Sequence, residues 1–176
     1  GNRFHTTRAP PHSAPPTVHR RGLMIFLVRH AKAGQRNDSV DADMQRPLSK
    51  AGWIQSNAIV APLLEAGAGR ILLASPYVRC MQTLEPLAAA LDLKVVADDR
   101  LAEAQPLGAL LEMIAEQPDG AVLCSHGDMI PDTMAALQRR GCDFIGEPNW
   151  KKASVWVIER DASGNATTAR CWSPPR

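Results

Sequence analysis

Four short apolar runs alternate with longer stretches of helical periodicity, and this alternation constrains the fold more than any other feature of the sequence. The runs are Leu23–Val28 (LMIFLV), Ile71–Ala74 (ILLA), Lys94–Ala97 (KVVA) and Ala121–Cys124 (AVLC). Short continuous apolar runs that include β-branched residues are typical of strands buried on both faces. Their alternation with helices predicts βαβ units and a mainly parallel sheet.

The stretches between the runs have recognisable helix ends. The first helix is expected to begin at Ser49 and to run to about Glu65, before two glycines. Further helices are expected from Ser75-Pro76 to about Leu91, over 106–117 and over 128–140, and two late strands over 154–159 and 166–172. The late strands, joined by a turn at 163–165, are expected to add an antiparallel edge. The predicted fold class is α/β, a three-layer sandwich with helices on both faces of a mainly parallel central sheet.

Residues 1–22 differ in composition from the rest of the chain. They contain four arginines, four prolines and no acidic residue, and too little apolar surface to offset the entropy of ordering. We therefore expect a disordered basic tail or linker, followed by one folded domain over 23–176. Because the chain begins with Gly1, a tag remnant or a removed initiator is also considered, with Met24 as an alternative start.

Composition excludes several classes of protein. The 176 residues are 45% hydrophobic, which is enough for one core, and no run approaches the ~20 apolar residues of a membrane span. The net charge of +2 is too small to indicate nucleic acid as a partner. The four cysteines are far apart in sequence, so we expect free thiols in a reducing cytoplasm rather than a disulfide scaffold or a metal site.

Reactive or phosphate-binding residue types follow each of the four predicted parallel strands. They are Arg29, His30, Ser75, Arg79, Glu103, Ser125, His126 and Gly127. Each has an ordinary interpretation when taken alone: Arg79 could pair with Glu85 on a helix surface, and Glu103 could be a solvated loop residue. Because ligands of open α/β sheets bind at the carboxyl ends of the strands, their coincidence favours one functional site.

This set of side chains is suited to phosphoryl transfer. Guanidinium groups match phosphate oxygens bidentately, an imidazole can carry a phosphoryl group, and a carboxylic acid can protonate the leaving oxygen. The sequence contains no Walker loop and no HExxH motif, so neither a nucleotide-triphosphate motor nor a metal or other cofactor is predicted.

The motif Leu27-Val28-Arg29-His30-Ala31 resembles the RHG signature of the histidine phosphatase superfamily, which has the phosphoglycerate-mutase-like fold. Ser75–Thr83, Arg100–Glu103 and Ser125–Gly127 resemble its later blocks, in family order. The chain is most similar to the short SixA-like phosphohistidine phosphatases and to the phosphatase domain that follows a Nudix domain in some bacterial proteins. Ala31 replaces the usual glycine of the signature, and the helical lid of mutases has no counterpart.

The resemblance implies roles for individual residues. His30 would be the phosphorylated nucleophile, with Arg29, Arg79 and His126 completing the phosphate pocket and Glu103 as general acid. Further substrate-binding residues would be Lys32, Arg36, Arg46, Ser75 and Gly127.

The predicted function is a metal-independent phosphatase that acts through a phosphohistidine on a phosphomonoester, a nucleotide or a protein phosphohistidine. The alternatives are a phosphoglycerate-mutase-type transferase and a non-catalytic phosphate-binding module. The expected partner is a phosphorylated small molecule or a phosphohistidine protein, without a membrane or nucleic acid, and the expected state is a monomer or weak dimer.

Overall fold

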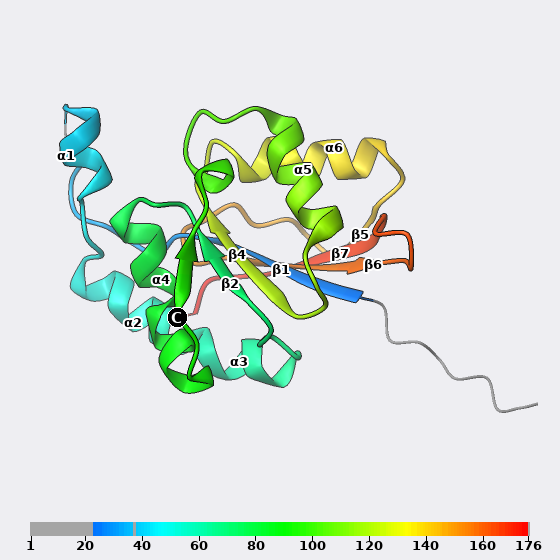
Figure 1. Ribbon diagram of the computed structural model, residues 1–176, viewed down its shortest axis with the longest axis horizontal. Helices are drawn as coiled ribbons and strands as arrows, with labels where there is room; N and C mark the ends of the chain where they lie inside the picture. Colours follow the sequence, from blue (N-terminus) through cyan, green and yellow to red (C-terminus); the bar gives the residue numbers. More distant parts are fainter. Residues whose placement is uncertain (1–22, 37, 176) are drawn as a thin grey trace, which may run out of the picture.

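The computed structural model describes residues 23–36 and 38–175, so the predicted disordered tail over 1–22 lies outside the described residues (Figure 1). The strands are β1 (Leu23–Arg29), β2 (Leu72–Ala74), β3 (Val95–Ala97), β4 (Ala121–Ser125), β5 (Asp143–Ile145), β6 (Val155–Arg160) and β7 (Ala166–Trp172). The helices are α1 (Val40–Met44), α2 (Lys50–Ala58), α3 (Val60–Glu65), α4 (Val78–Leu91), α5 (Leu107–Glu116) and α6 (Ile130–Arg139), with a short 3₁₀ helix η1 (Asp99–Leu101).

The strands of the described chain form one seven-stranded sheet in the order β3-β2-β4-β1-β6-β7-β5. The first four strands in this order, β3, β2, β4 and β1, are parallel to one another, as predicted. β6 pairs antiparallel with both β1 and β7, and β5 pairs parallel with β7. The carboxyl ends of β1, β2, β3 and β4 therefore lie at the same edge, and β6 begins there because it runs in the opposite direction.

Helices cover both faces of the sheet, which confirms the predicted three layers (Figure 1). Along β1, Ile25 and Leu27 pack into the core cluster that includes residues of α5 and α6. Phe26 and Val28 face the other way and join the cluster that includes residues of α3 and α4. A strand with a core on each face must be apolar at every position, which explains the continuous run in the sequence.

The structure corrects three details of the sequence prediction. The helix expected from Ser49 to Glu65 is divided into α2 and α3 at Ile59. Pro62 explains the division, because proline has no N–H and its ring clashes with the carbonyl group four residues earlier. The late hairpin is not the edge of the sheet, because β5, which was not predicted, lies outside β7. The short helix α1, capped by the Ser39 hydroxyl, was not predicted either.

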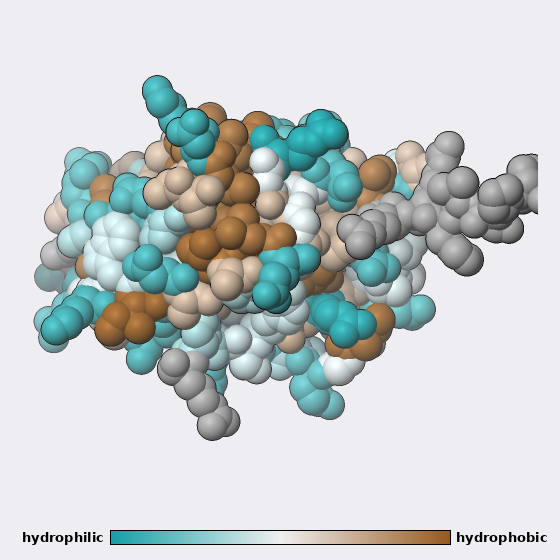
Figure 2. All heavy atoms as spheres, turned by 90° about the horizontal axis from the view of Figure 1, so that it is seen from below, coloured by the Kyte–Doolittle hydropathy of each residue, from teal (hydrophilic) through white to brown (hydrophobic). Residues whose placement is uncertain are grey.

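The outer side of the layer that contains α2 and α3 is seen in Figure 2, where polar residues surround a central group of hydrophobic ones. Ile54 of α2 is 62% exposed and Leu64 of α3 is 39% exposed.

Within the described ranges no helix is long and apolar enough to cross a membrane. All four cysteines are free thiols.

Candidate active site

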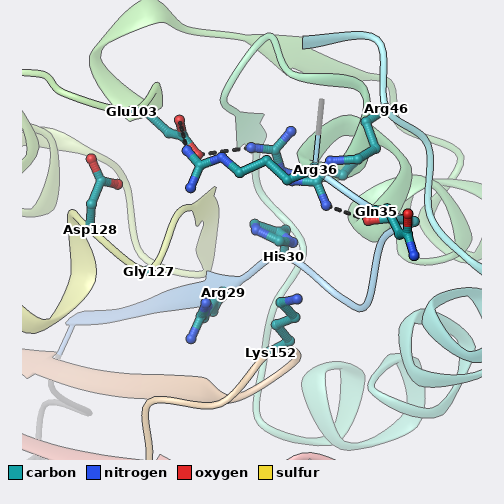
Figure 3. Close-up of a pocket in the computed structure, with 11 residues that line it drawn as sticks. Arg29, His30, Gln35, Arg36, Arg46, Glu103, Gly127, Asp128 and Lys152 are labelled. Carbon is teal, nitrogen blue, oxygen red and sulfur yellow. Dashed lines mark hydrogen bonds and ion pairs between the residues drawn. The ribbon is translucent and has the colours of Figure 1, made fainter. Parts of the chain in front are cut away.

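The parallel pairing of β1 with β4 places the residues that follow the two strands side by side. Arg29 is in register with Ser125, and the His30 N–H donates to the Ser125 carbonyl oxygen over 3.1 Å. A cavity of about 470 Å³ opens at this edge. Its lining residues, shown in Figure 3, are Arg29, His30, Gly34, Gln35, Arg36, Arg46, Arg79, Glu103, Gly127, Asp128 and Lys152.

One ring nitrogen of His30 forms a hydrogen bond to the backbone, and the other is free to react. Its Nδ1 lies 2.8 Å from the Ala31 carbonyl oxygen, to which only a protonated Nδ1 can donate. Nε2 then carries the lone pair, and no described residue hydrogen-bonds to it. Burial, followed by the charges of Arg79 and Arg29, lowers the pKa of His30 to about 3. A neutral imidazole with a free Nε2 at a cavity is the form that a nucleophile requires.

His126 is not among the residues that line this cavity, but its ring centroid lies 5.4 Å from that of His30, which does. Its Nε2 lies 2.8 Å from the Ser75 hydroxyl, which itself accepts the Tyr77 N–H over 3.3 Å. The hydroxyl can donate or accept at Nε2, but the carboxylate oxygen Glu103 Oε1, 3.5 Å from Nδ1, can only accept. This neighbour favours the tautomer with the ring proton on Nδ1, in which the Ser75 hydroxyl donates to Nε2. Burial lowers the pKa of His126 to about 2, so its imidazole is also neutral.

Arg79 is fully buried and is fixed by two carboxylates. Its Nη1 donates to the Asp43 backbone oxygen over 2.9 Å, and its Nη2 contacts Asp43 Oδ2 at 3.2 Å and Glu103 Oε1 at 2.8 Å. The same Asp43 carboxylate accepts Arg46 Nε over 3.0 Å. Asp43 is 5% exposed, so one buried acid holds two guanidinium groups at the cavity. Asp43 was not among the residues predicted from the sequence.

Arg29 is positioned by backbone contacts at the other side of His30. Its Nη1 donates to the Trp150 carbonyl oxygen over 2.5 Å, and burial lowers its pKa. Its guanidinium packs against Gly127, where a Cβ atom would lie 2.6 Å from Arg29 Cζ. A larger residue at position 127 would therefore displace the flexible end of the Arg29 side chain, whereas the backbone conformation of Gly127 does not itself favour glycine.

The structure brings most, but not all, of the predicted site residues to the cavity. Arg36 and Arg46 line it, whereas Lys32 is exposed and does not, and Ser75 is buried against His126. Ala31 has an ordinary backbone conformation, as its replacement of glycine requires. The lining residue Lys152 was not predicted, although it lies in the loop before β6, which starts at this edge of the sheet.

The cavity has a cationic character. Five of its lining side chains are basic, and only Glu103 and Asp128 are acidic. Arg29 Nε and Arg79 Nε are buried without a hydrogen-bond partner in the described part of the chain, so each of these two guanidinium groups keeps an unsatisfied donor. The described residues contain no group of three or more His, Cys, Asp or Glu that could hold a metal ion. The arrangement is suited to a phosphate ester facing a nucleophilic imidazole.

The chain is similar to known proteins of one superfamily. The family model of the histidine phosphatase superfamily (branch 1) matches residues 25–107. The 8-oxo-(d)GTP phosphatase of Mycolicibacterium smegmatis is 35% identical over 159 residues, covering 86% of this chain and 48% of that protein. This chain therefore spans about half the length of that relative.

Solved structures agree in fold. The protein histidine phosphatase SixA in complex with tungstate has a TM-score of 0.66 at 24% identity, covering 82% of this chain and 92% of that one. A protein of Agrobacterium tumefaciens assigned as a phosphohistidine phosphatase SixA has a TM-score of 0.64 at 21% identity, covering 78% and 92%. With the motifs, the family match and the fold in agreement, the chain belongs to the histidine phosphatase superfamily.

Proposed function

We propose that this chain is a phosphatase that transfers a phosphoryl group first to His30 and then to water, without a metal ion. The observation that carries the proposal is the state of His30. Its Nδ1 is tied to a backbone carbonyl oxygen, its pKa is far below neutrality, and its Nε2 faces a cavity lined by arginines. The ring is thus ready to attack phosphorus at neutral pH without first losing a proton.

The first step forms the bond between His30 Nε2 and phosphorus and breaks the bond between phosphorus and the leaving oxygen. Arg29 and Arg79 stabilise the charge on the non-bridging oxygens, which is the main task in phosphoryl transfer. A phosphate bound by Arg79 takes the place of Glu103 on that guanidinium. Glu103, in its protonated form, then gives its proton to the leaving oxygen.

The second step returns the enzyme to its starting state. Glu103, now a carboxylate, removes a proton from a water molecule that attacks the phosphorus atom of phospho-His30. The bond between Nε2 and phosphorus breaks, inorganic phosphate leaves, and His30 is again neutral. Protons and electron pairs balance over the two steps.

For the substrate we favour a phosphorylated small molecule, with nucleotides first. The 35% identical relative is named for a nucleotide, whereas the likeness to SixA, at 24% identity or less, concerns the fold alone. A protein phosphohistidine remains the second candidate because the site is open to solvent at Arg36, whose side chain is 73% exposed.

The test combines trapping of the intermediate with a substrate panel. The full chain, with EDTA present, is mixed briefly with nucleotides, sugar phosphates, p-nitrophenyl phosphate and a phosphohistidine protein. We expect turnover and acid-labile, base-stable phosphate on the protein, both lost in His30→Ala and kept in Lys151→Met, a surface control. Activity that survives in His30→Ala would refute the mechanism, and loss of activity with EDTA would refute metal independence. Phosphate binding without any turnover would favour a binding module, and transfer to a second substrate rather than to water a mutase.

A further inference from the structure

The loop over 149–154 is attached to the end of β1, where His30 lies. The Ala153 N–H donates to the carbonyl oxygens of Arg29 and His30 over 3.1 and 3.2 Å. The Ser154 carbonyl oxygen accepts the Arg29 N–H over 3.1 Å. Lys152, next to Ala153, lines the cavity. The same backbone contacts that hold the end of β1 therefore hold the base of the Lys152 side chain beside the nucleophile.

Ala153 adopts a backbone conformation that alanine rarely takes, with φ of 65° and no exposed surface. Such conformations persist only where surrounding contacts enforce them, and they are concentrated at functional sites. Here the bifurcated hydrogen bond to β1 enforces it. The loop thus has a fixed shape at Lys152, although Lys152 precedes the strand and lies on no regular element.

The ammonium group of Lys152 differs from most other cations of the cavity in lacking a counter-charge. Arg79 and Arg46 share Asp43, and Arg36 contacts Glu103 at 3.4 Å. No described residue forms a hydrogen bond or ion pair with the Lys152 side chain. Partial burial, and then the positive charges of Arg29, Arg46 and Arg79, lower the pKa of Lys152. An anion that enters the cavity relieves this repulsion.

The charged side chains of the cavity lie on two sides of His30 (Figure 3). Arg29 and Lys152 lie on one side of His30, and Glu103, with Arg36 beside it, lies on the other. The Glu103 side suits the leaving oxygen, since that oxygen needs a proton. The Arg29 and Lys152 side suits the non-bridging oxygens of the phosphoryl group, which stay negative throughout the transfer.

We propose that Lys152 is a further catalytic residue, a third cationic ligand that binds a non-bridging oxygen of the transferred phosphoryl group together with Arg29 and Arg79. The proposal rests on the proposed function. His126 is neutral, and Arg79 keeps its ion pair with Asp43 when a phosphate displaces Glu103, so Lys152 supplies further positive charge where the phosphoryl group meets His30. With Lys152 as a ligand, the phosphate site of this chain would contain three cations rather than the two arginines alone.

Direct binding of inorganic phosphate tests the proposal without depending on the substrate. Calorimetry on the full chain, at pH 7.5 and constant ionic strength, compares wild type with Lys152→Met, Lys152→Gln and Lys152→Arg. We expect binding at least ~10-fold weaker in the two neutral variants and largely retained in Lys152→Arg, because the loss is one charge-assisted contact. Lys151→Met is the matched control, because its side chain is exposed and does not line the cavity.

Kinetics on the best substrate from the panel separates a ligand of the transition state from a residue that only attracts the substrate. We expect kcat and kcat/KM both to fall by ~10²-fold in Lys152→Met, whereas a rise in KM at constant kcat would assign Lys152 to substrate capture and overturn its catalytic role. Equal phosphate affinity in Lys152→Met and Lys151→Met would overturn the proposal while leaving the function intact. Failure of the wild type to bind phosphate would instead count against the proposed function itself. Unchanged melting temperatures exclude misfolding, and two neutral variants guard against one that does not fold.

Discussion

The ends of β1 and β4 lie side by side and each carries a buried histidine, yet the two rings are held in different ways. His30 has one backbone contact at Nδ1 and a free Nε2 at the cavity. His126 is engaged at both nitrogens, by Ser75 at Nε2 and by Glu103 near Nδ1. Burial keeps both imidazoles neutral, so the protonation state does not separate their roles. Hydrogen bonding, and not protonation, therefore separates the ring that we propose as nucleophile from the ring that we propose as donor.

Among the variants that test this difference, His126→Gln is expected to have the largest effect on turnover. We expect turnover to fall by ~10²–10³-fold, because a phosphate that displaces Glu103 Oε1 would leave the Nδ1–H of His126 free to donate to a phosphoryl oxygen, and the loss of such a donor typically has this cost. The phosphoenzyme should still form, although slowly, in contrast with its complete absence in His30→Ala. Ser75→Ala should move kcat in the same direction by ~10-fold, because it releases the ring from the tautomer with the proton on Nδ1. Complete loss of phosphoenzyme in His126→Gln would mean that the two roles are not separable in this way.

Glu103 contacts His126, Arg79 and Arg36. Its replacement tests whether it donates a proton to the leaving oxygen. We expect Glu103→Gln to slow alkyl phosphates by ~10²-fold and p-nitrophenyl phosphate by less than ~10-fold, because an aryl oxide leaves without a proton. The measurement is the ratio of kcat/KM for the two substrates. Equal slowing of both would make Glu103 a binding residue. No effect on either would direct attention to Asp128, which also lines the cavity.

The smallest expected effect concerns stability. Both histidines have folded pKa values, about 3 and about 2, below the usual 6.5, so the unfolded chain takes up protons first as the pH falls. Stability is therefore complete above about pH 6.5 and declines toward the folded pKa values, by up to ~1.4 kcal/mol per pH unit for each histidine. Urea unfolding at pH 7.5 and 5.0 should show a loss of ~2 kcal/mol per histidine. His30→Gln and His126→Gln should each remove the share of one histidine, about half of the loss for both together. An unchanged pH dependence in both variants would show that the rings titrate normally.

The alternation of buried strands and helices was sufficient to predict the layers, the parallel part of the sheet and the edge where the site lies. The same signal located His30, Arg79 and His126, because each follows a predicted parallel strand. Periodicity did not reveal the break at Ile59, since a proline within a helical pattern shifts backbone hydrogen bonds without altering the apolar face. The three-residue strand β5 is too short and too exposed for any pattern to identify it.

Asp43 and Lys152 were missed for a different reason. Both lie in segments whose place is set by tertiary contacts rather than by periodicity: Asp43 in the five-residue helix α1, and Lys152 in the loop before β6. Lys152 could have been found from the direction of one strand. A strand antiparallel to β1 begins where β1 ends, so the residues before it belong to the same edge as His30. For Asp43 the sequence contained one signal, its position three residues before Arg46, which is compatible with an ion pair on a helix.

The contact between Gly127 and the Arg29 guanidinium allows the position of one cation to be changed without removing its charge. A methyl group at position 127 would lie 2.6 Å from Arg29 Cζ, so Gly127→Ala would push the end of the arginine side chain aside while both histidines keep their sequence positions. All the proposed catalytic side chains would still be present in that variant. A comparison of Gly127→Ala with wild type therefore measures what the placement of the Arg29 charge contributes, apart from the charge itself.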